Sequence, residues 1–209
     1  MSKNRALIVV DIQNDFLPGG NLAVAGGDEI VDSVNTLIEA FDTVVLTADW
    51  HPQNHISFAV NHPGHKTFEL IDVAYGKQVL WPAHCVAGTR GAAFCEKLNT
   101  DKAAVVIRKG MNIDCDSYSG FVEADRKTKT GLAGWLTERG IEEVWVCGLA
   151  TDFCVAWTAQ DAAAAGFKTY LIEDASKAID IDGSLAAAKA AWETAGVVSA
   201  NVAQVLGDR

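Results

Sequence analysis

Cys154 is the side chain in this sequence best placed to act as a nucleophile. It ends the segment 144–154, in which an apolar β-branched stretch predicts a buried strand and Gly148 predicts a tight turn after it. Thr151 or Asp152 would then cap a helix, which places Cys154 in the first helical turn. Free backbone N–H groups and the helix dipole there favour a thiolate and can hold an oxyanion. An isolated cysteine is more often a small buried apolar residue, so this interpretation depends on its surroundings.

Reactive side chains also follow three other predicted strands. They are Asp11 after residues 6–10, Asp49 and His51 after residues 43–48, and Lys109 after residues 103–108. In open α/β sheets the ligand lies beyond the carboxyl ends of the strands. We therefore expect a carboxylate, a carboxylate–imidazole pair, an amine and a thiol at one edge of the sheet.

Asp11, Lys109 and Cys154 form a chemically coherent set. A thiol must lose its proton to become a nucleophile, and Asp11 can accept that proton if the site is desolvated. The ammonium of Lys109 would favour the thiolate and keep Asp11 charged in the resting enzyme. A structural ion pair between Asp11 and Lys109 is the alternative, and the presence of Cys154 favours the catalytic interpretation.

Asp49 and His51 predict a second, separate site. At i, i+2 spacing on an extended segment both side chains point to one side, and His84 is the candidate third ligand. One carboxylate and two imidazoles suit one divalent ion, zinc, iron(II) or manganese, and leave coordination positions open. His55 is a candidate for a further or supporting ligand, although a surface-loop position fits it better.

The predicted elements alternate between strands and helices. Strands are expected at residues 6–10, 43–48, 103–108, 143–147, 168–172 and 197–199, and helices at 28–40, 130–139, 151–166 and 183–195. This alternation predicts an α/β fold, a single three-layer domain over residues 1–209 with a mostly parallel sheet and helices on both faces. Residues 49–100 interrupt the pattern but contain all five histidines, so we expect an ordered, loop-rich insertion that binds the metal.

The composition excludes several classes of partner. The formal net charge of −10 argues against nucleic acid and membrane surfaces as partners, because either would need a basic face. The first apolar run, residues 6–10, is too short for a signal peptide, and no run is long enough to span a bilayer. The five cysteines are odd in number and lack disulfide-framework spacing, which predicts reduced thiols and a cytoplasmic location.

Five ordered motifs resemble those of the nicotinamidases (pyrazinamidases), members of the isochorismatase-like cysteine hydrolase superfamily. They are VDIQNDF at 10–16, DWHP at 49–52, WPAHCV at 81–86, KG at 109–110 followed by DSYSGF at 116–121, and GLATDFCV at 148–155. The resemblance runs over nearly the whole chain, and the Asp-x-His motif separates nicotinamidases from relatives that lack the metal.

The resemblance implies a role for each matching position. Asp11, Lys109 and Cys154 correspond to a catalytic triad, and Leu149–Ala150 corresponds to a cis peptide bond. That bond would turn the Ala150 N–H, with the Cys154 N–H, toward the carboxamide oxygen as an oxyanion hole. The implied metal ligands are Asp49, His51 and His84, usually for zinc or iron. The implied substrate-binding residues are Phe16, Trp81, Tyr118, Leu149 and Ala150.

The implied reaction converts nicotinamide and water to nicotinate and ammonia through a Cys154 thioester, with pyrazinamide also accepted. The pyridine nitrogen would bind the metal, and the product would serve NAD salvage or catabolism. Enzymes of this architecture often form homo-oligomers. Three alternatives stay open at this point: a cysteine amidohydrolase for another small carboxamide or carbamoyl substrate, a non-haem iron oxygenase using Asp49, His51 and His84, and a binding module without activity.

Overall fold

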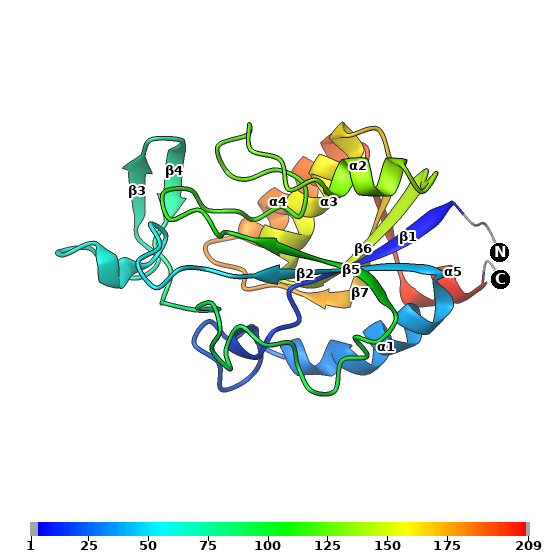
Figure 1. The fold of residues 1–209 in the computed structure, drawn as a ribbon, viewed down its shortest axis with the longest axis horizontal. Helices are drawn as coiled ribbons and strands as arrows, with labels where there is room; N and C mark the ends of the chain where they lie inside the picture. Colours follow the sequence, from blue (N-terminus) through cyan, green and yellow to red (C-terminus); the bar gives the residue numbers. More distant parts are fainter. Residues whose placement is uncertain (1–3, 208–209) are drawn as a thin grey trace.

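The computed structural model describes residues 4–207 and is built on one six-stranded sheet with the order β5-β2-β1-β6-β7-β8 (Figure 1). Every neighbouring pair in this sheet is parallel. Its strands are β1 (Arg5–Val10), β2 (Thr43–Asp49), β5 (Ala103–Lys109), β6 (Glu143–Leu149), β7 (Lys168–Lys177) and β8 (Val198–Ala200). The predicted α/β fold class is confirmed.

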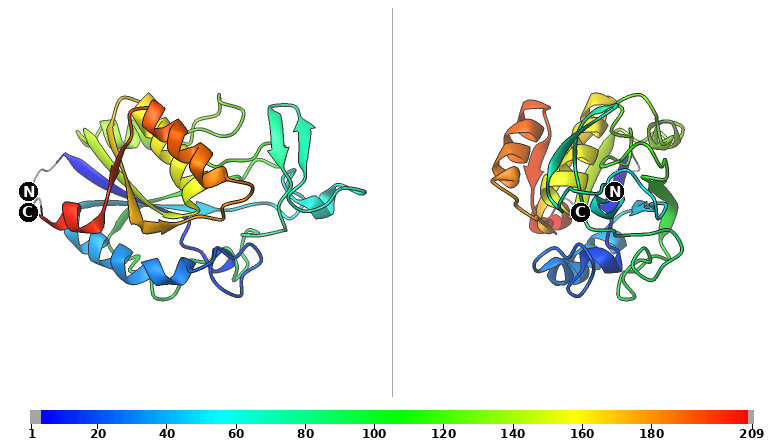
Figure 2. Two further views of the ribbon diagram at one scale, coloured as in Figure 1. Left: turned by 180° about the vertical axis from the view of Figure 1, so that it is seen from behind. Right: turned by 90° about the vertical axis from the view of Figure 1, so that its left-hand side faces the viewer.

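Helices cover both faces of the sheet, as predicted. The helices are α1 (Val31–Ala40), α2 (Leu132–Thr137), α3 (Ala156–Ala164), α4 (Ser184–Thr194) and α5 (Val202–Gly207). Alternate strand residues divide the core in two because successive side chains of a strand point to opposite faces. Leu7 and Val9 pack with α1 and α5, whereas Ile8 and Val10 pack with α2, α3 and α4. Figures 1 and 2 show these two helical layers on either side of the sheet.

The part of segment 49–100 around residues 59–80 forms an arm that projects from one end of the molecule (Figure 2), whereas Ala92 and Leu98 pack in the hydrophobic core. It contains an antiparallel hairpin of β3 (Leu70–Val73) and β4 (Gly76–Val79) that the sequence did not predict. The residues of β3 and β4 are exposed or half-buried except Gln78, and they show no strong apolar alternation. The rest of the segment consists of turns and isolated bridges, so it is loop-rich as expected.

Several predicted boundaries differ from the observed ones. Strand β7 continues to Lys177 instead of ending at residue 172, because Glu173 and Asp174 bond to α4 and α5 rather than ending the strand. Helix α2 is shorter than expected at both ends, and helix α5 was not predicted. The segment 28–40 begins with a 3-10 turn over Gly27–Ile30 before α1.

The structure corrects two expectations for the segment before α3. Gly148 lies inside β6 rather than in a turn, with φ +123°, and a Cβ there would lie 2.1 Å from the carbonyl oxygen of Val10. Glycine is therefore needed for the close approach of β6 to β1. Neither Thr151 nor Asp152 caps the helix, because Thr151–Val155 is a π-helical turn without a side-chain cap.

Candidate active site

The ends of four strands bring the predicted catalytic residues together. Asp49 and Lys109 are the last residues of β2 and β5 and pair directly in the parallel register. Asp11 follows β1 with φ +50°, a left-handed conformation that aspartate tolerates better than most residues. Cys154 lies in the π-helical turn after β6. The strand-end prediction is therefore confirmed in its geometry.

The ammonium of Lys109 is the centre of this cluster, and the residue is 1% exposed. Its Nζ lies 2.8 Å from Asp11 Oδ2 and 2.5 Å from Asp49 Oδ1. It also lies 3.3 Å from Cys154 Sγ and 3.1 Å from the carbonyl oxygen of Ser117. One buried cation thus contacts both carboxylates and the thiol.

Burial controls the protonation of the nucleophile. Desolvation raises the pKa of the Cys154 thiol well above its ordinary value, Lys109 only partly offsets this, and the carboxylate of Asp11 adds to it. Burial therefore opposes the thiolate that a helix N-terminus would favour. Desolvation also raises the pKa of Asp11, against the lowering effect of Lys109. A more basic Asp11 beside a neutral thiol is the arrangement that general-base activation requires.

Thr47 fixes the orientation of Asp11. Its hydroxyl donates a hydrogen bond of 2.6 Å to Asp11 Oδ1, and its carbonyl oxygen accepts from the Asp11 backbone N–H at 3.3 Å. Thr47 was not identified from the sequence because a threonine within an apolar run is typical of any strand. Only the pairing of β1 with β2 shows that it faces Asp11.

Asp49, His51 and His84 lie close enough together to share one metal ion. The Asp49 Oδ2 atom is 3.5 Å from His51 Nε2 and 3.7 Å from His84 Nε2, and all three residues are buried. The Nδ1 atom of His51 lies 2.8 Å from the carbonyl oxygen of Gly110, and that of His84 lies 2.8 Å from that of Pro82.

These backbone contacts fix the tautomers of the two histidines. A carbonyl can only accept, so each Nδ1 carries the proton and each Nε2 directs a lone pair toward Asp49. Burial would raise the pKa of Asp49, but the ammonium of Lys109 outweighs it and holds this pKa well below its usual range. An ionised carboxylate with two neutral imidazoles is a donor set that fits a divalent transition metal.

Gln13 and Asp15 hold the backbone around these ligands. Gln13 donates to the carbonyl oxygens of Asp49 and Ala92 and accepts from the Asp49 N–H, each at 2.8 Å. Asp15 Oδ2 accepts from the N–H of Cys85 at 2.7 Å, next to His84. Both lie in the VDIQNDF segment, but the sequence analysis gave neither a role because their partners are distant in sequence.

His55 uses both ring nitrogens within the protein. Its Nδ1 lies 2.7 Å from Ser57 Oγ and its Nε2 lies 3.2 Å from the carbonyl oxygen of Cys115. The His55 ring packs against that of His51 at a centroid distance of 4.3 Å. His55 is fully buried, so the surface-loop expectation is wrong. Both ring nitrogens are thus hydrogen-bonded, which favours a supporting position beside His51, and His55 also forms a second cluster of possible metal ligands with His51 and Asp116.

The nucleophile and the metal-ligand cluster open into one cavity with an empty volume of about 340 Å³. Phe16, Trp81, Tyr118 and Ala150 line it, as the predicted substrate-binding set requires. The side chain of Leu149 instead packs in the hydrophobic core. The Leu149–Ala150 peptide bond is cis, as predicted. The sequence analysis gave no role to the other lining residues, although three of them belong to the matched motifs; they are Leu22, Asp116, Ser117, Phe153 and Ile179.

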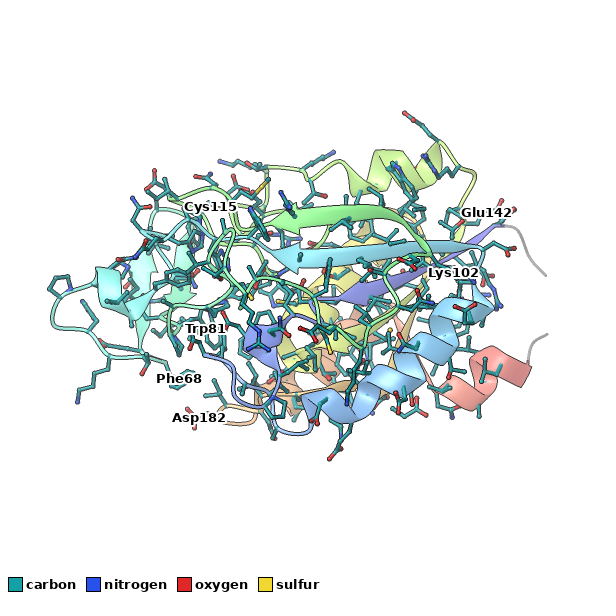
Figure 3. The ribbon with its side chains drawn as sticks, turned by 60° about the horizontal axis from the view of Figure 1, so that its bottom comes forward. Phe68, Trp81, Lys102, Cys115, Glu142 and Asp182 are labelled. Atoms are coloured by element: carbon teal, nitrogen blue, oxygen red, sulfur yellow. The ribbon has the colours of Figure 1, made fainter. Side chains whose placement is uncertain are left out.

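Hydrogen bonds fix the aromatic wall of the cavity. The hydroxyl of Tyr118 accepts from Trp81 Nε1 at 3.0 Å and from Gln78 Nε2 at 3.1 Å. Phe153 meets the edge of Trp81 at a centroid distance of 5.0 Å. Because Gln78 lies in β4, the projecting arm supports this wall. Figure 3 shows Trp81 and Phe68 of the arm at the same end of the molecule.

Comparison with known proteins agrees with this geometry. Residues 5–202 match the isochorismatase domain. The chain belongs to the isochorismatase family. It is 58% identical to a nicotinamidase from Acinetobacter baylyi over 192 residues, which cover 92% of this chain and 88% of that relative. The predicted resemblance is confirmed.

Two solved structures of this family have the same fold. The first is an Acinetobacter baumanii nicotinamidase–pyrazinamidase, with a TM-score of 0.97, 56% identity, and 98% and 99% of the two chains covered. The second is the pyrazinamidase of Pyrococcus horikoshii in complex with zinc, with a TM-score of 0.77, 39% identity, and 95% and 99% covered. Within residues 4–207, no helix has the length and apolar character needed to cross a bilayer.

Proposed function

We propose that this protein hydrolyses nicotinamide to nicotinate and ammonia and also accepts pyrazinamide. Its curated relatives at high identity are nicotinamidases, which makes it a hydrolase that acts on an amide. The observation that carries the proposal is the shared cavity. A thiol in contact with a buried lysine and two carboxylates faces the same aromatic-lined space as an aspartate–histidine–histidine cluster.

In the first half of the reaction, Asp11 accepts the Cys154 proton as Sγ bonds to the carboxamide carbon. The N–H groups of Ala150 and Cys154 would hold the oxyanion, a contribution of about 3 kcal/mol per donor in comparable sites. Asp11 then gives its proton to the amide nitrogen, the C–N bond breaks and ammonia leaves. The product of this half is a Cys154 thioester.

In the second half, Asp11 takes a proton from water while the water oxygen bonds to the thioester carbon. The C–S bond breaks, Asp11 returns its proton to the Cys154 thiolate, and nicotinic acid leaves and gives its proton to water as nicotinate. Throughout, Lys109 stays protonated, because Asp11 and Asp49 hold its pKa well above the ordinary value despite burial. Its fixed charge would stabilise the transient thiolate, which lies within 3.3 Å.

Asp49, His51 and His84 would hold one divalent metal ion, zinc or iron being the best matches to this donor set. When bound, such an ion supplies a Lewis-acidic position that can orient a ring nitrogen. The zinc complex of the Pyrococcus horikoshii relative supports this assignment. The residues of this chain shape the rest of the pocket, with Phe16 and Trp81 against the ring.

The test is ammonia release from nicotinamide by purified protein, measured beside Cys154→Ala, Cys95→Ala and a metal-stripped sample. Cys95 is half-buried and outside the cavity, so its variant is the matched control and should keep full activity. Cys154→Ala should abolish release, and metal removal should reduce it sharply. Absence of release from metal-loaded protein would reject nicotinamide as substrate, and activity in Cys154→Ala would reject the nucleophile.

A further inference from the structure

The cavity is also lined by one residue of a loop that follows β7, away from the four strand ends described above. Residues 178–183 connect β7 to α4, and Ile179 of this loop lines the cavity with Trp81 and Phe153. Asp180 and Asp182 have φ values of +53° and +51°, so the loop follows a specific left-handed path. Figure 3 shows Asp182 at the same end of the molecule as Trp81.

Asp152 anchors this loop through hydrogen bonds to its backbone. It lies two residues before Cys154 in the π-helical turn and is 4% exposed. Its Oδ1 accepts from the Ile179 N–H at 3.1 Å, and its Oδ2 accepts from the Asp180 N–H at 2.8 Å. The same Oδ2 accepts from the Ser184 hydroxyl at 2.5 Å. Because every partner is a donor, the contact needs a carboxylate with two accepting oxygens.

Ser184 completes the anchor at the far end of the loop. Its Oγ accepts from the Ile181 N–H at 2.9 Å while donating to Asp152, and Ser184 is the first residue of α4. The backbone of Ile179 is thus bonded directly to the turn that carries the nucleophile. A shift of the loop would move the Ile179 side chain relative to Cys154, and both line the same cavity.

We propose that Ile179 is a specificity-determining residue that limits which ring substituents enter the cavity, and that Asp152 is the positioning residue that holds it there. This proposal rests on the proposed amide hydrolysis. A side chain that fills one wall of a pocket discriminates against an added methyl group by about 10- to 200-fold. Asp152 acts through the Ile179 backbone, and neither residue takes part in the proton transfers.

The experiment compares kcat and KM for nicotinamide with those for nicotinamides carrying one methyl group at each ring carbon in turn. The proteins are wild type, Ile179→Ala, Asp152→Asn and the control Asp161→Asn. Asp161 is also buried but lies on α3, where it pairs with Arg126 away from the cavity. Wild-type turnover of nicotinamide is measured first, so a failure of the proposed function is recognised separately.

Ile179→Ala should improve the kcat/KM of at least one methylated substrate relative to nicotinamide by about tenfold or more. Asp152→Asn turns an NH₂ group toward N–H and O–H donors, so it should relax the same selectivity and raise KM more than it lowers kcat. Asp161→Asn should leave selectivity unchanged. Unchanged selectivity in Ile179→Ala overturns the specificity role.

Two further results separate positioning from general damage. Alkylation of Cys154 by iodoacetamide should proceed at the wild-type rate in Asp152→Asn. If Asp152→Asn instead slows alkylation and lowers kcat together while selectivity stays unchanged, the substitution has damaged Cys154 itself. That result overturns the positioning role. If Asp152→Asn does not fold, Ser184→Ala removes one of the three donors and decides the question. Unchanged selectivity in that variant then overturns the role of the anchor.

Discussion

Gln13→Leu should be among the most destabilising single substitutions in this protein. The Gln13 side chain is fully buried and makes three hydrogen bonds of 2.8 Å, two with the Asp49 backbone and one with the carbonyl oxygen of Ala92. Leucine has a similar size but can neither donate nor accept. The substitution therefore leaves one buried N–H and two buried carbonyl groups without their partner.

The magnitude follows from these three groups. A buried polar group that loses its partner costs about 1–3 kcal/mol, and neighbouring losses are not fully additive. We expect the free energy of unfolding to fall by about 3–5 kcal/mol. In a chain of this length, each kcal/mol lowers Tm by about 2–4 °C, so Tm should fall by about 6–20 °C. Because these three hydrogen bonds hold the backbone of Asp49, the amount of metal that the protein retains after dialysis should fall as well.

Gln160→Leu is the matched control. Gln160 is half-buried on α3 and makes a single hydrogen bond, from Nε2 to the Ala156 carbonyl oxygen in its own helix. Losing it should cost less than about 1.5 kcal/mol. Urea unfolding followed by circular dichroism gives both values, and metal analysis gives the retained ion. If Gln13→Leu is no more destabilising than Gln160→Leu, the three hydrogen bonds of Gln13 do not stabilise the fold as argued.

Three other substitutions test further contacts. Thr47→Val removes the donor to the Asp11 carboxylate and should cost about 1–3 kcal/mol in urea unfolding, whereas Thr43→Val on the same strand should cost little. Gly91→Ala places a Cβ 2.1 Å from a buried carboxylate and should lower Tm, while Gly134→Ala, with open space in a helix, should not. His55→Gln should retain one metal equivalent, and loss of the ion would show that His55 is a ligand.

The strand ends could be predicted from the sequence because their signal is local. Apolar runs followed by Asp11, Asp49 and Lys109 identify both the strands and the residues beyond them, and parallel strands end at one edge of the sheet. The alternation of strands and helices also predicts the layers. What the pattern does not contain is the order of the strands, which makes Asp49 and Lys109 direct neighbours.

The supporting residues could not be predicted because their partners are distant in sequence. Gln13 contacts a residue 36 positions away, and Asp152 contacts residues 27 to 32 positions away. A helix cap is the local interpretation of Asp152, and it fails because the carboxylate serves a different loop. The burial of Cys154 among carboxylates likewise raises the pKa of its thiol, an effect that the pattern of a helix terminus alone does not contain.

One carboxylate links the two halves of the site. Asp49 Oδ1 faces Lys109, which contacts the nucleophile, while Oδ2 faces the imidazoles of His51 and His84. Since Asp49 and Lys109 are paired residues of adjacent strands, the sheet register fixes these two residues side by side, whereas Cys154, His51 and His84 lie on segments outside the strands. An aromatic amide with a ring nitrogen also holds two reactive atoms at a fixed separation. In the proposed reaction, this edge of the sheet would favour such a substrate, and the loop that carries Ile179 would select among its ring substituents.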